Sequence, residues 1–212
     1  MAWKEITFAY CNSLLRTELH IAIQPDDRLG LSVGEEGSVN SAFPLTELPD
    51  GDHVLVRTSG KWCSVFCGDA AAPRPAVVFP GAFNPLHSGH LRIADTAAAL
   101  LEQPVAFELS VTNVDKPPLS LRDIARRVQG FPEDETIWIT RAPTFSAKSR
   151  VFRGACFLIG VDTAERLADP WYYGRSTARR DEAISEIARR GCRFLVFGRV
   201  QRGQFQSLAD LR

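Results

Sequence analysis

Hydrophobic and polar residues follow two different patterns along the chain. Residues 1–73 contain short runs in which apolar and polar residues alternate, a pattern typical of half-buried antiparallel strands. We expect such strands in ELHIAIQ, RLGLSVG, DHVLVRTSG and KWCSVFC, with a hairpin turn at TSGK and a helix at YCNSLLRTE. From residue 74 onward, continuous apolar runs alternate with segments of helical period, which is typical of buried parallel strands joined by helices.

The pattern after residue 74 predicts an alternating order of strands and helices. Strands are expected in PAVVF, VAFELSV, TIWIT, CFLIGV and RFLVFG, and helices over Ser88–Glu102, Leu119–Gln129, Thr163–Ala168 and Thr177–Arg190. FSAKSRVF is ambiguous between the two. The repeated strand, helix, strand order predicts an α/β fold with a doubly wound parallel sheet and right-handed connections. Small residues and prolines in GDAAAPRPAV indicate a boundary near residue 73, between a small β-rich amino-terminal unit (1–73) and an α/β domain (74–212).

Composition narrows the classes of partner. The 212 residues are 45% hydrophobic, enough for one core with a small additional unit, and 25 Lys and Arg balance 25 Asp and Glu. Because the net charge is zero, we expect neither nucleic acid nor a membrane surface as a partner. No apolar run approaches the roughly 18 residues of a spanning helix, the amino terminus lacks a signal pattern, and the five cysteines are scattered. These features predict a cytoplasmic protein and specify no oligomeric state.

Candidate chemistry is concentrated in FPGAFNPLHSGHL, residues Phe79–Leu91, between the first buried strand and the helix that follows it. Ligands of open α/β sheets bind at such strand ends. Gly81 would let the backbone turn sharply, and Gly89 would let a ligand approach the first helical turn, whose free N–H groups favour phosphate. His87 and His90 are three residues apart, so both rings can lean to one side of that turn. Together they could neutralise and orient a triphosphate.

The segment GAFNPLHSGHL resembles the H-x-G-H signature of the nucleotidylyltransferase superfamily. Three further segments, SVTNVDKPPLSL, FLIGVDTAERLADPWYYG and GCRFLVFGRVQRGQF, resemble a cytidylyltransferase-like branch of it. The resemblance implies a Rossmann-like fold and a reaction in which an acceptor oxygen attacks the α-phosphorus of a nucleoside triphosphate and releases pyrophosphate, usually with Mg²⁺ bridging phosphate oxygens. The leading hypothesis is adenylyl transfer from ATP to nicotinate or nicotinamide mononucleotide. Cytidylyl transfer to a phosphorylated alcohol and a non-catalytic nucleotide-binding module are the alternatives.

The resemblance also implies roles for individual residues. It assigns His87 and His90 to catalysis, as the groups that hold the phosphates and stabilise charge at the α-phosphorus. The nucleotide-binding residues it implies are Gly81, Ala82, Phe83, Asn84, Gly89, Gly160, Asp162, Thr163 and Arg199, and the substrate-binding residues are Asn113, Lys116 and Trp171. No residue is assigned to a protein-bound metal.

Three of these assignments have equally ordinary structural interpretations. Asp162 also fits a helix cap. Trp171, in PWYYG with Tyr172 and Tyr173, also fits a packed aromatic turn rather than a stacking surface. Arg199 also fits a solvated strand end.

One motif of the superfamily is missing from its expected place. Relatives carry a late I-S-S-T-x-x-R motif that binds the triphosphate, and it should follow FLVFGR, where this sequence lacks it. The similar string RSTARR precedes that strand, and we interpret it as a chance match. The missing motif favours the nucleotide-binding module, whereas the intact histidine pair favours an enzyme.

Overall fold

A computed structural model describes residues 4–9, 21–23, 53–67, 72–201 and 204–207. The strand expected in RLGLSVG and the helix expected in YCNSLLRTE lie outside the described residues. Within them, no helix has the length and apolar character needed to cross a membrane.

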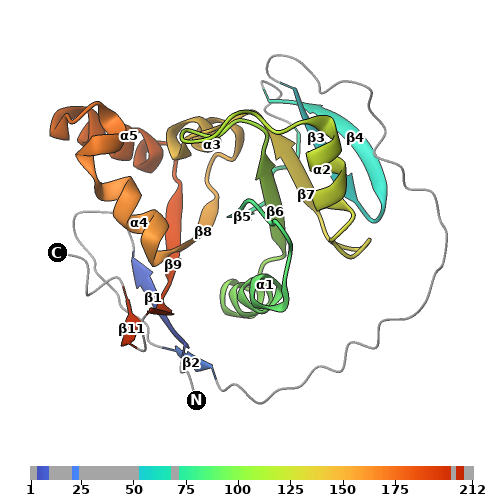
Figure 1. Ribbon diagram of the computed structural model, residues 1–212, viewed down its shortest axis with the longest axis horizontal. Helices are drawn as coiled ribbons and strands as arrows, with labels where there is room; N and C mark the ends of the chain where they lie inside the picture. The colour runs from blue at the N-terminus through green and yellow to red at the C-terminus, as the bar shows by residue number, and fades with distance from the viewer. Residues whose placement is uncertain (1–3, 10–20, 24–52, 68–71, 202–203, 208–212) are drawn as a thin grey trace.

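Parallel strands form the centre of the sheet, as the apolar runs predict. They are β5 (Val77–Pro80), β6 (Val105–Ser110), β7 (Ile137–Thr140), β8 (Cys156–Gly160) and β9 (Arg193–Phe197). Nine of the described strands assemble in the order β2-β1-β9-β8-β5-β6-β7-β3-β4, with β1 antiparallel to β9 and β3 antiparallel to β7 (Figure 1). The protein therefore has the predicted α/β, Rossmann-like fold.

Strands from residues 1–73 extend this sheet at both edges. On one side lie β1 (Lys4–Ala9) and β2 (Ile21–Ile23), and on the other β3 (His53–Thr58) and β4 (Lys61–Phe66). The predicted hairpin joins β3 to β4 in antiparallel register. Strands from both sides of residue 73 therefore pair in one sheet. The domain boundary at that residue stays a prediction.

The helices confirm the 3.6-residue pattern. They are α1 (Ser88–Leu101), α2 (Leu121–Val128), α3 (Phe145–Val151), α4 (Val161–Ala168) and α5 (Thr177–Arg189), with a 3₁₀ turn, η1, at Pro170–Tyr173. The ambiguous FSAKSRVF segment is α3, whose start is capped where the Thr144 hydroxyl accepts the Ala147 N–H at 3.2 Å. After β9 the chain forms a short hairpin of β10 (Arg199–Gln201) and β11 (Gln204–Gln206).

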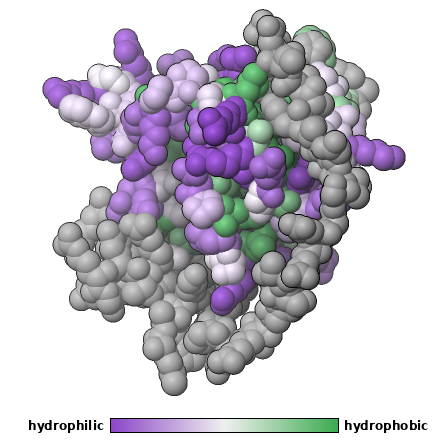
Figure 2. Space-filling model, turned by 45° about the vertical axis from the view of Figure 1, so that its right-hand side comes forward, coloured by the Kyte–Doolittle hydropathy of each residue, from purple (hydrophilic) through white to green (hydrophobic). Residues whose placement is uncertain are grey.

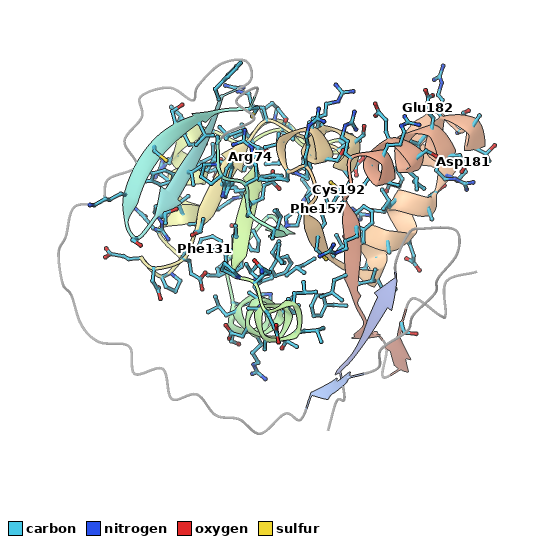
Figure 3. All side chains as sticks on the ribbon, turned by 180° about the vertical axis from the view of Figure 1, so that it is seen from behind. Arg74, Phe131, Phe157, Asp181, Glu182 and Cys192 are labelled. Carbon is cyan, nitrogen blue, oxygen red and sulfur yellow. The ribbon has the colours of Figure 1, made fainter. Side chains whose placement is uncertain are left out.

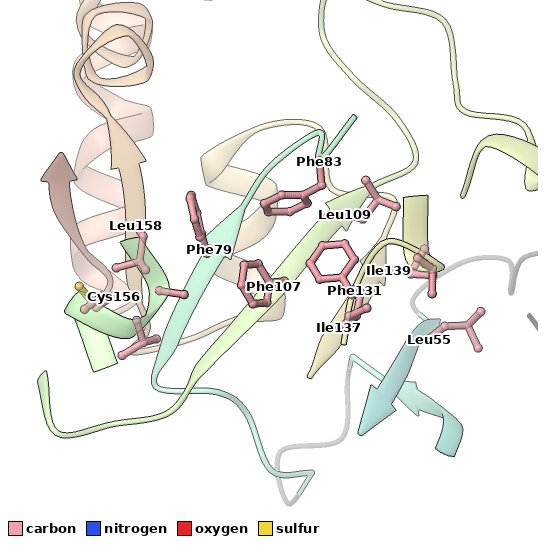
Figure 4. Close-up of a cluster of buried hydrophobic side chains, with 14 of the residues drawn as sticks. Leu55, Phe79, Phe83, Phe107, Leu109, Phe131, Ile137, Ile139, Cys156 and Leu158 are labelled. Carbon is pink, nitrogen blue, oxygen red and sulfur yellow. The ribbon is translucent and has the colours of Figure 1, made fainter. Parts of the chain in front are cut away.

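Helices cover both faces of the sheet, and alternation along the strands divides the core in two. Val77 and Phe79 point to the face covered by α1 and α2, whereas Val78 points to the face that contains Ile187 of α5. Figure 4 shows Phe79 on the first face, near the rings of Phe83 and Phe107. Figure 3 shows Phe157 and Cys192 inside the body of the protein. In Figure 2, polar residues cover most of the coloured surface and hydrophobic residues show mainly in the gaps between them.

The order of the central strands creates a switch point at β5. From β5 the chain passes through α1 to β6 on one side, and it reaches β8, on the other side of β5, only after β7. The connections that leave the carboxyl ends of the adjacent strands β5 and β8 therefore run in opposite directions, to β6 and to β9, and doubly wound sheets bind ligands at such a point. The histidine-containing loop follows directly from that end.

Candidate active site

The loop after β5 is shaped by a phenylalanine that folds back on it. Phe83 takes a positive φ of 41° and is only 2% exposed. Its ring lies so close to Gly81 that a Cβ there would be 2.5 Å from Phe83 Cζ. Gly81 is therefore needed for this close approach, and the positive φ in this turn occurs at Phe83.

Phe83 consequently belongs to the core. Its ring packs edge-on against Phe79, Phe107 and Phe131, with centroid distances of 5.2 to 5.6 Å (Figure 4). A nucleotide contact at this position would have to use the backbone. The loop is also held from α2, because the Arg127 guanidinium donates to the Ala82 carbonyl at 2.8 Å. Asn84 is exposed, with its Oδ1 atom 3.5 Å from Arg126 Nη2.

His87 and His90 stack at the start of α1. Their ring centroids are 3.6 Å apart with 20° between the planes, and the His87 backbone N–H donates to His90 Nδ1 at 3.3 Å. Gly89 leaves space for the first ring, because a Cβ there would be 3.0 Å from His87 Nδ1. This arrangement confirms the juxtaposition expected from the spacing of the two residues.

The environment of His90 sets its charge. Phe79 and Phe83 pack edge-on against the imidazole at 6.0 and 5.2 Å between centroids. Burial against these rings, with a smaller contribution from neighbouring His87, lowers the pKa of His90 to about 4. His90 is thus neutral at pH 7, and because Nδ1 accepts a hydrogen bond, its proton is on Nε2. It presents a neutral N–H donor rather than a positive charge.

A cleft of about 570 Å³ opens at the carboxyl ends of β5, β6 and β7. Five of the sequence-predicted residues line it: Gly81, Ala82, Asn113, Lys116 and Thr163. The other predicted residues do not line it, and these include His87 and His90, which follow Gly81 and Ala82 in the same loop and at the start of α1. The cleft and the histidine pair are thus neighbouring parts of one strand-end region, joined by the backbone of Gly81 and Ala82.

The sequence left open whether the aromatic segment PWYYG is a packed turn or a surface on which a ligand stacks, and the 3₁₀ turn η1 has features of both. Trp171 is 59% exposed and lies under the Arg175 guanidinium, 4.2 Å from the ring centroid. Tyr172 and Tyr173 line the cleft instead, and the Tyr173 hydroxyl donates to the Leu167 carbonyl at 3.1 Å. The turn is therefore a packed element that presents its two tyrosines, rather than the predicted tryptophan, to the cleft.

The remaining predicted residues occupy the ends of β8 and β9. Gly160 immediately precedes α4 as its N-cap, and Asp162 lies in the first turn of that helix. Arg199 begins β10, and its side chain lies outside the described part of the structure. The nucleotide-binding roles of these residues stay predictions.

Sequence reasoning missed two charged residues at the floor of the cleft. Glu108 of β6 and Lys148 of α3 both line it, although they are only 0% and 5% exposed. Lys148 Nζ lies 2.8 Å from Glu108 Oε2. A glutamate inside the apolar run VAFELSV was the available signal, since a buried carboxylate needs a partner.

The described residues also limit how Mg²⁺ could be held. Among them, no group of three or more His, Cys, Asp or Glu side chains is arranged to hold a metal ion. Mg²⁺ bound mainly by substrate phosphates and water needs only one or two carboxylates. Asp115 supplies a carboxylate at the cleft, so the site fits an ion that arrives with the nucleotide.

Residues 78–199 match the family model described as cytidylyltransferase-like. The chain belongs to this cytidylyltransferase-like family. The match runs from β5 to the start of β10, so this domain contains the loop, the histidine pair and the cleft. No curated protein and no solved structure gives a significant match. The family lies within the nucleotidylyltransferase superfamily, which supports a function of nucleotidylyltransferase type.

Proposed function

We propose that this domain transfers a nucleoside monophosphate from a nucleoside triphosphate to a phosphorylated acceptor and releases pyrophosphate. The leading pair of substrates is ATP with nicotinate or nicotinamide mononucleotide. The observation that carries the proposal is the stacked pair of His87 and His90 at the amino terminus of α1, beside a cleft large enough for a small acceptor. The cleft takes the acceptor, and the triphosphate lies across the Gly81–Ala82 backbone, from the edge of the cleft to the histidines.

In this reaction an oxygen of the acceptor phosphate forms a bond to the α-phosphorus. The bond from the α-phosphorus to the bridging α–β oxygen breaks, and pyrophosphate leaves with that electron pair. His90 donates its Nε2 proton in a hydrogen bond to a non-bridging phosphate oxygen, where charge develops in the transition state. The free N–H groups of the first turn of α1 favour the same anion. Most of the rate enhancement comes from positioning the two substrates.

Mg²⁺, when bound with the nucleotide, would neutralise phosphate charge, and Asp115 is the cleft carboxylate that would hold it. The two substrates meet over the backbone of Gly81 and Ala82, and Arg127 fixes that backbone through the Ala82 carbonyl. We retain the cytoplasmic location and the absence of nucleic-acid and membrane partners as parts of the proposal.

Two other functions have an observation in their favour. The family description favours cytidylyl transfer to a phosphorylated alcohol. The β10–β11 hairpin, found where relatives carry the late serine- and threonine-rich motif, favours a non-catalytic nucleotide-binding module.

The decisive assay is pyrophosphate release from ATP or CTP in the presence of a panel of acceptors: nicotinate mononucleotide, nicotinamide mononucleotide and phosphorylated alcohols. We expect release with ATP and one of the two mononucleotides. His90→Ala should lower it by several powers of ten, because the transition state loses its Nε2 donor. Gln103→Ala, an exposed change just beyond the opposite end of α1, is the matched control and should be neutral.

The outcomes separate the three functions. Release with CTP and a phosphorylated alcohol would support the cytidylyltransferase. If neither nucleotide is consumed but one of them raises the melting temperature, the protein is a binding module. A folded His90→Ala variant with unchanged turnover would refute the role given to this histidine.

A further inference from the structure

The buried pair of Glu108 and Lys148 at the floor of the cleft has no part in the reaction described above. Lys148 Nζ lies 2.9 Å from Glu108 Oε1, 2.8 Å from Glu108 Oε2 and 2.7 Å from the Ala142 carbonyl oxygen. The three protons of the ammonium group are therefore directed at two charged oxygens and one uncharged oxygen.

Glu108 is held from a second direction. The Thr140 hydroxyl donates to Glu108 Oε1 and accepts the Ala142 N–H at 3.1 Å. Ser110 Oγ lies 2.9 Å from the Ala142 carbonyl oxygen. The carboxylate is therefore fixed in the ends of β6 and β7, and it in turn fixes the lysine.

The pair is unusual in position rather than in geometry. Removing two charges from water costs free energy that an apolar pair of the same size avoids, so a buried ion pair is weak evidence of a stabilising role. This one lies at a cleft that both residues line, and the Lys148 side chain is the more exposed of the two, at 7% against 0% for Glu108. The lysine is therefore the member of the pair that a ligand in the cleft reaches more easily.

The walls above the pair carry further groups that suit an anion. Lys116 follows β6 and Arg166 belongs to α4, and both are exposed and line the cleft. Ser110 and Thr144 bring hydroxyl groups to the same lining. Three cationic side chains therefore line the cleft against two carboxylates, those of Glu108 and Asp115.

We propose that Lys148, held by Glu108, is the floor of a binding site for a phosphate monoester. Lys148 keeps both contacts with the carboxylate and exchanges its contact with the uncharged Ala142 carbonyl for an oxygen of the phosphate, because hydrogen bonds between charged groups are the stronger ones. Lys116 and Arg166 approach the phosphate from the walls. The assignment of this phosphate to the acceptor rests on the proposed function, whereas the anion site itself does not.

The test uses inorganic phosphate as the probe, with binding followed by calorimetry and by the melting temperature of the whole chain. The variant is E108Q/K148M, which removes both buried charges together, because K148M alone would leave a buried carboxylate without its partner. Lys61→Met is the matched control, as Lys61 is exposed on β4 at the edge of the sheet. Circular dichroism verifies that each variant is folded.

We expect phosphate to bind the wild-type chain and the Lys61→Met control equally, and E108Q/K148M to bind about tenfold more weakly or not at all. If E108Q/K148M does not fold, K116M/R166M, which removes the two exposed cations of the cleft walls, is measured in its place. A wild-type chain that does not bind phosphate, or a folded variant that binds it as well as wild type does, overturns the inference.

Pyrophosphate release from the same preparations separates this inference from the proposed function. Phosphate binding that depends on Lys148, without pyrophosphate release from any nucleotide, refutes the transferase and leaves the anion site standing. Pyrophosphate release with phosphate binding unchanged in E108Q/K148M refutes the anion site and leaves the transferase standing.

Discussion

Lowering the pH tests the environment assigned to His90. The folded protein holds the pKa of this imidazole at about 4 rather than 6.5, chiefly through burial. Protonation would also end the hydrogen bond that Nδ1 accepts from the His87 N–H. Because the folded pKa lies below the unfolded value, the unfolded chain takes up the proton first as the pH falls. The stability contributed by neutral His90 is thus complete above pH 6.5 and is lost as the pH falls toward 4.

The size of this loss follows from the two pKa values. Each tenfold change in proton affinity corresponds to about 1.4 kcal/mol, so the full difference between 6.5 and 4 corresponds to about 3 kcal/mol. Water reaches part of the His90 ring and screens the effect, so we expect about 1–2 kcal/mol. His90→Gln, which cannot take up a proton in this range, should lack this part of the pH dependence.

The assay has two parts. Proton NMR of the imidazole Cε1–H signals gives the pKa of each of the four histidines, with His90→Gln and His87→Gln used to assign them. Urea unfolding at pH 7.5 and pH 4.5 gives the free energy of unfolding of wild type and His90→Gln. Adding ATP should raise the pKa of His90, because a nearby anion favours the protonated imidazole. A His90 pKa of 6 or more in the free protein would refute the account of its neutral N–H donor.

Three further changes test the loop and its supports. Gly81→Ala should destabilise the protein by about 1–3 kcal/mol in urea unfolding, because its Cβ would overlap the ring of buried Phe83, and an unchanged midpoint would contradict that packing. Arg127→Met, which removes the hydrogen bond to the Ala82 carbonyl, should cost about 1 kcal/mol and speed amide exchange in the loop, so unaltered exchange would argue against the anchor. Ser120→Ala should lower the melting temperature through loss of about 1 kcal/mol, since the Ser120 hydroxyl caps α2, and equal melting would show that the cap is dispensable.

Local sequence pattern was sufficient for most of the fold. The five parallel strands follow from continuous apolar runs, because each strand is buried on both faces of the sheet. Four of the helices follow from the helical spacing of their apolar residues. FSAKSRVF was not resolved because α3 has only seven residues, too few for its period to stand out. The pairing of β1 with β9 and of β3 with β7 is long-range and leaves no local mark in the sequence.

The sequence predicted those features of the candidate site that depend on the spacing of residues along the chain. It did not predict those that depend on tertiary packing. The stack of His87 and His90 follows from three-residue spacing at a helix start. The burial of Phe83 does not, because it depends on a positive φ that folds the ring onto Gly81. The ion pair of Glu108 and Lys148 joins residues 40 positions apart, and only the approach of α3 to β6 brings them together.

The placement of the amino-terminal strands has a consequence for any shortened form of the protein. The outer parallel strands, β9 and β7, each have one margin occupied by a strand from residues 1–73. Without those residues, both margins would carry rows of unsatisfied backbone N–H and C=O groups, which invite other chains to add strands. A protein shortened in this way would expose two apolar strands as new edges and tend to aggregate, whereas with residues 1–73 present the described sheet ends at β2 and β4.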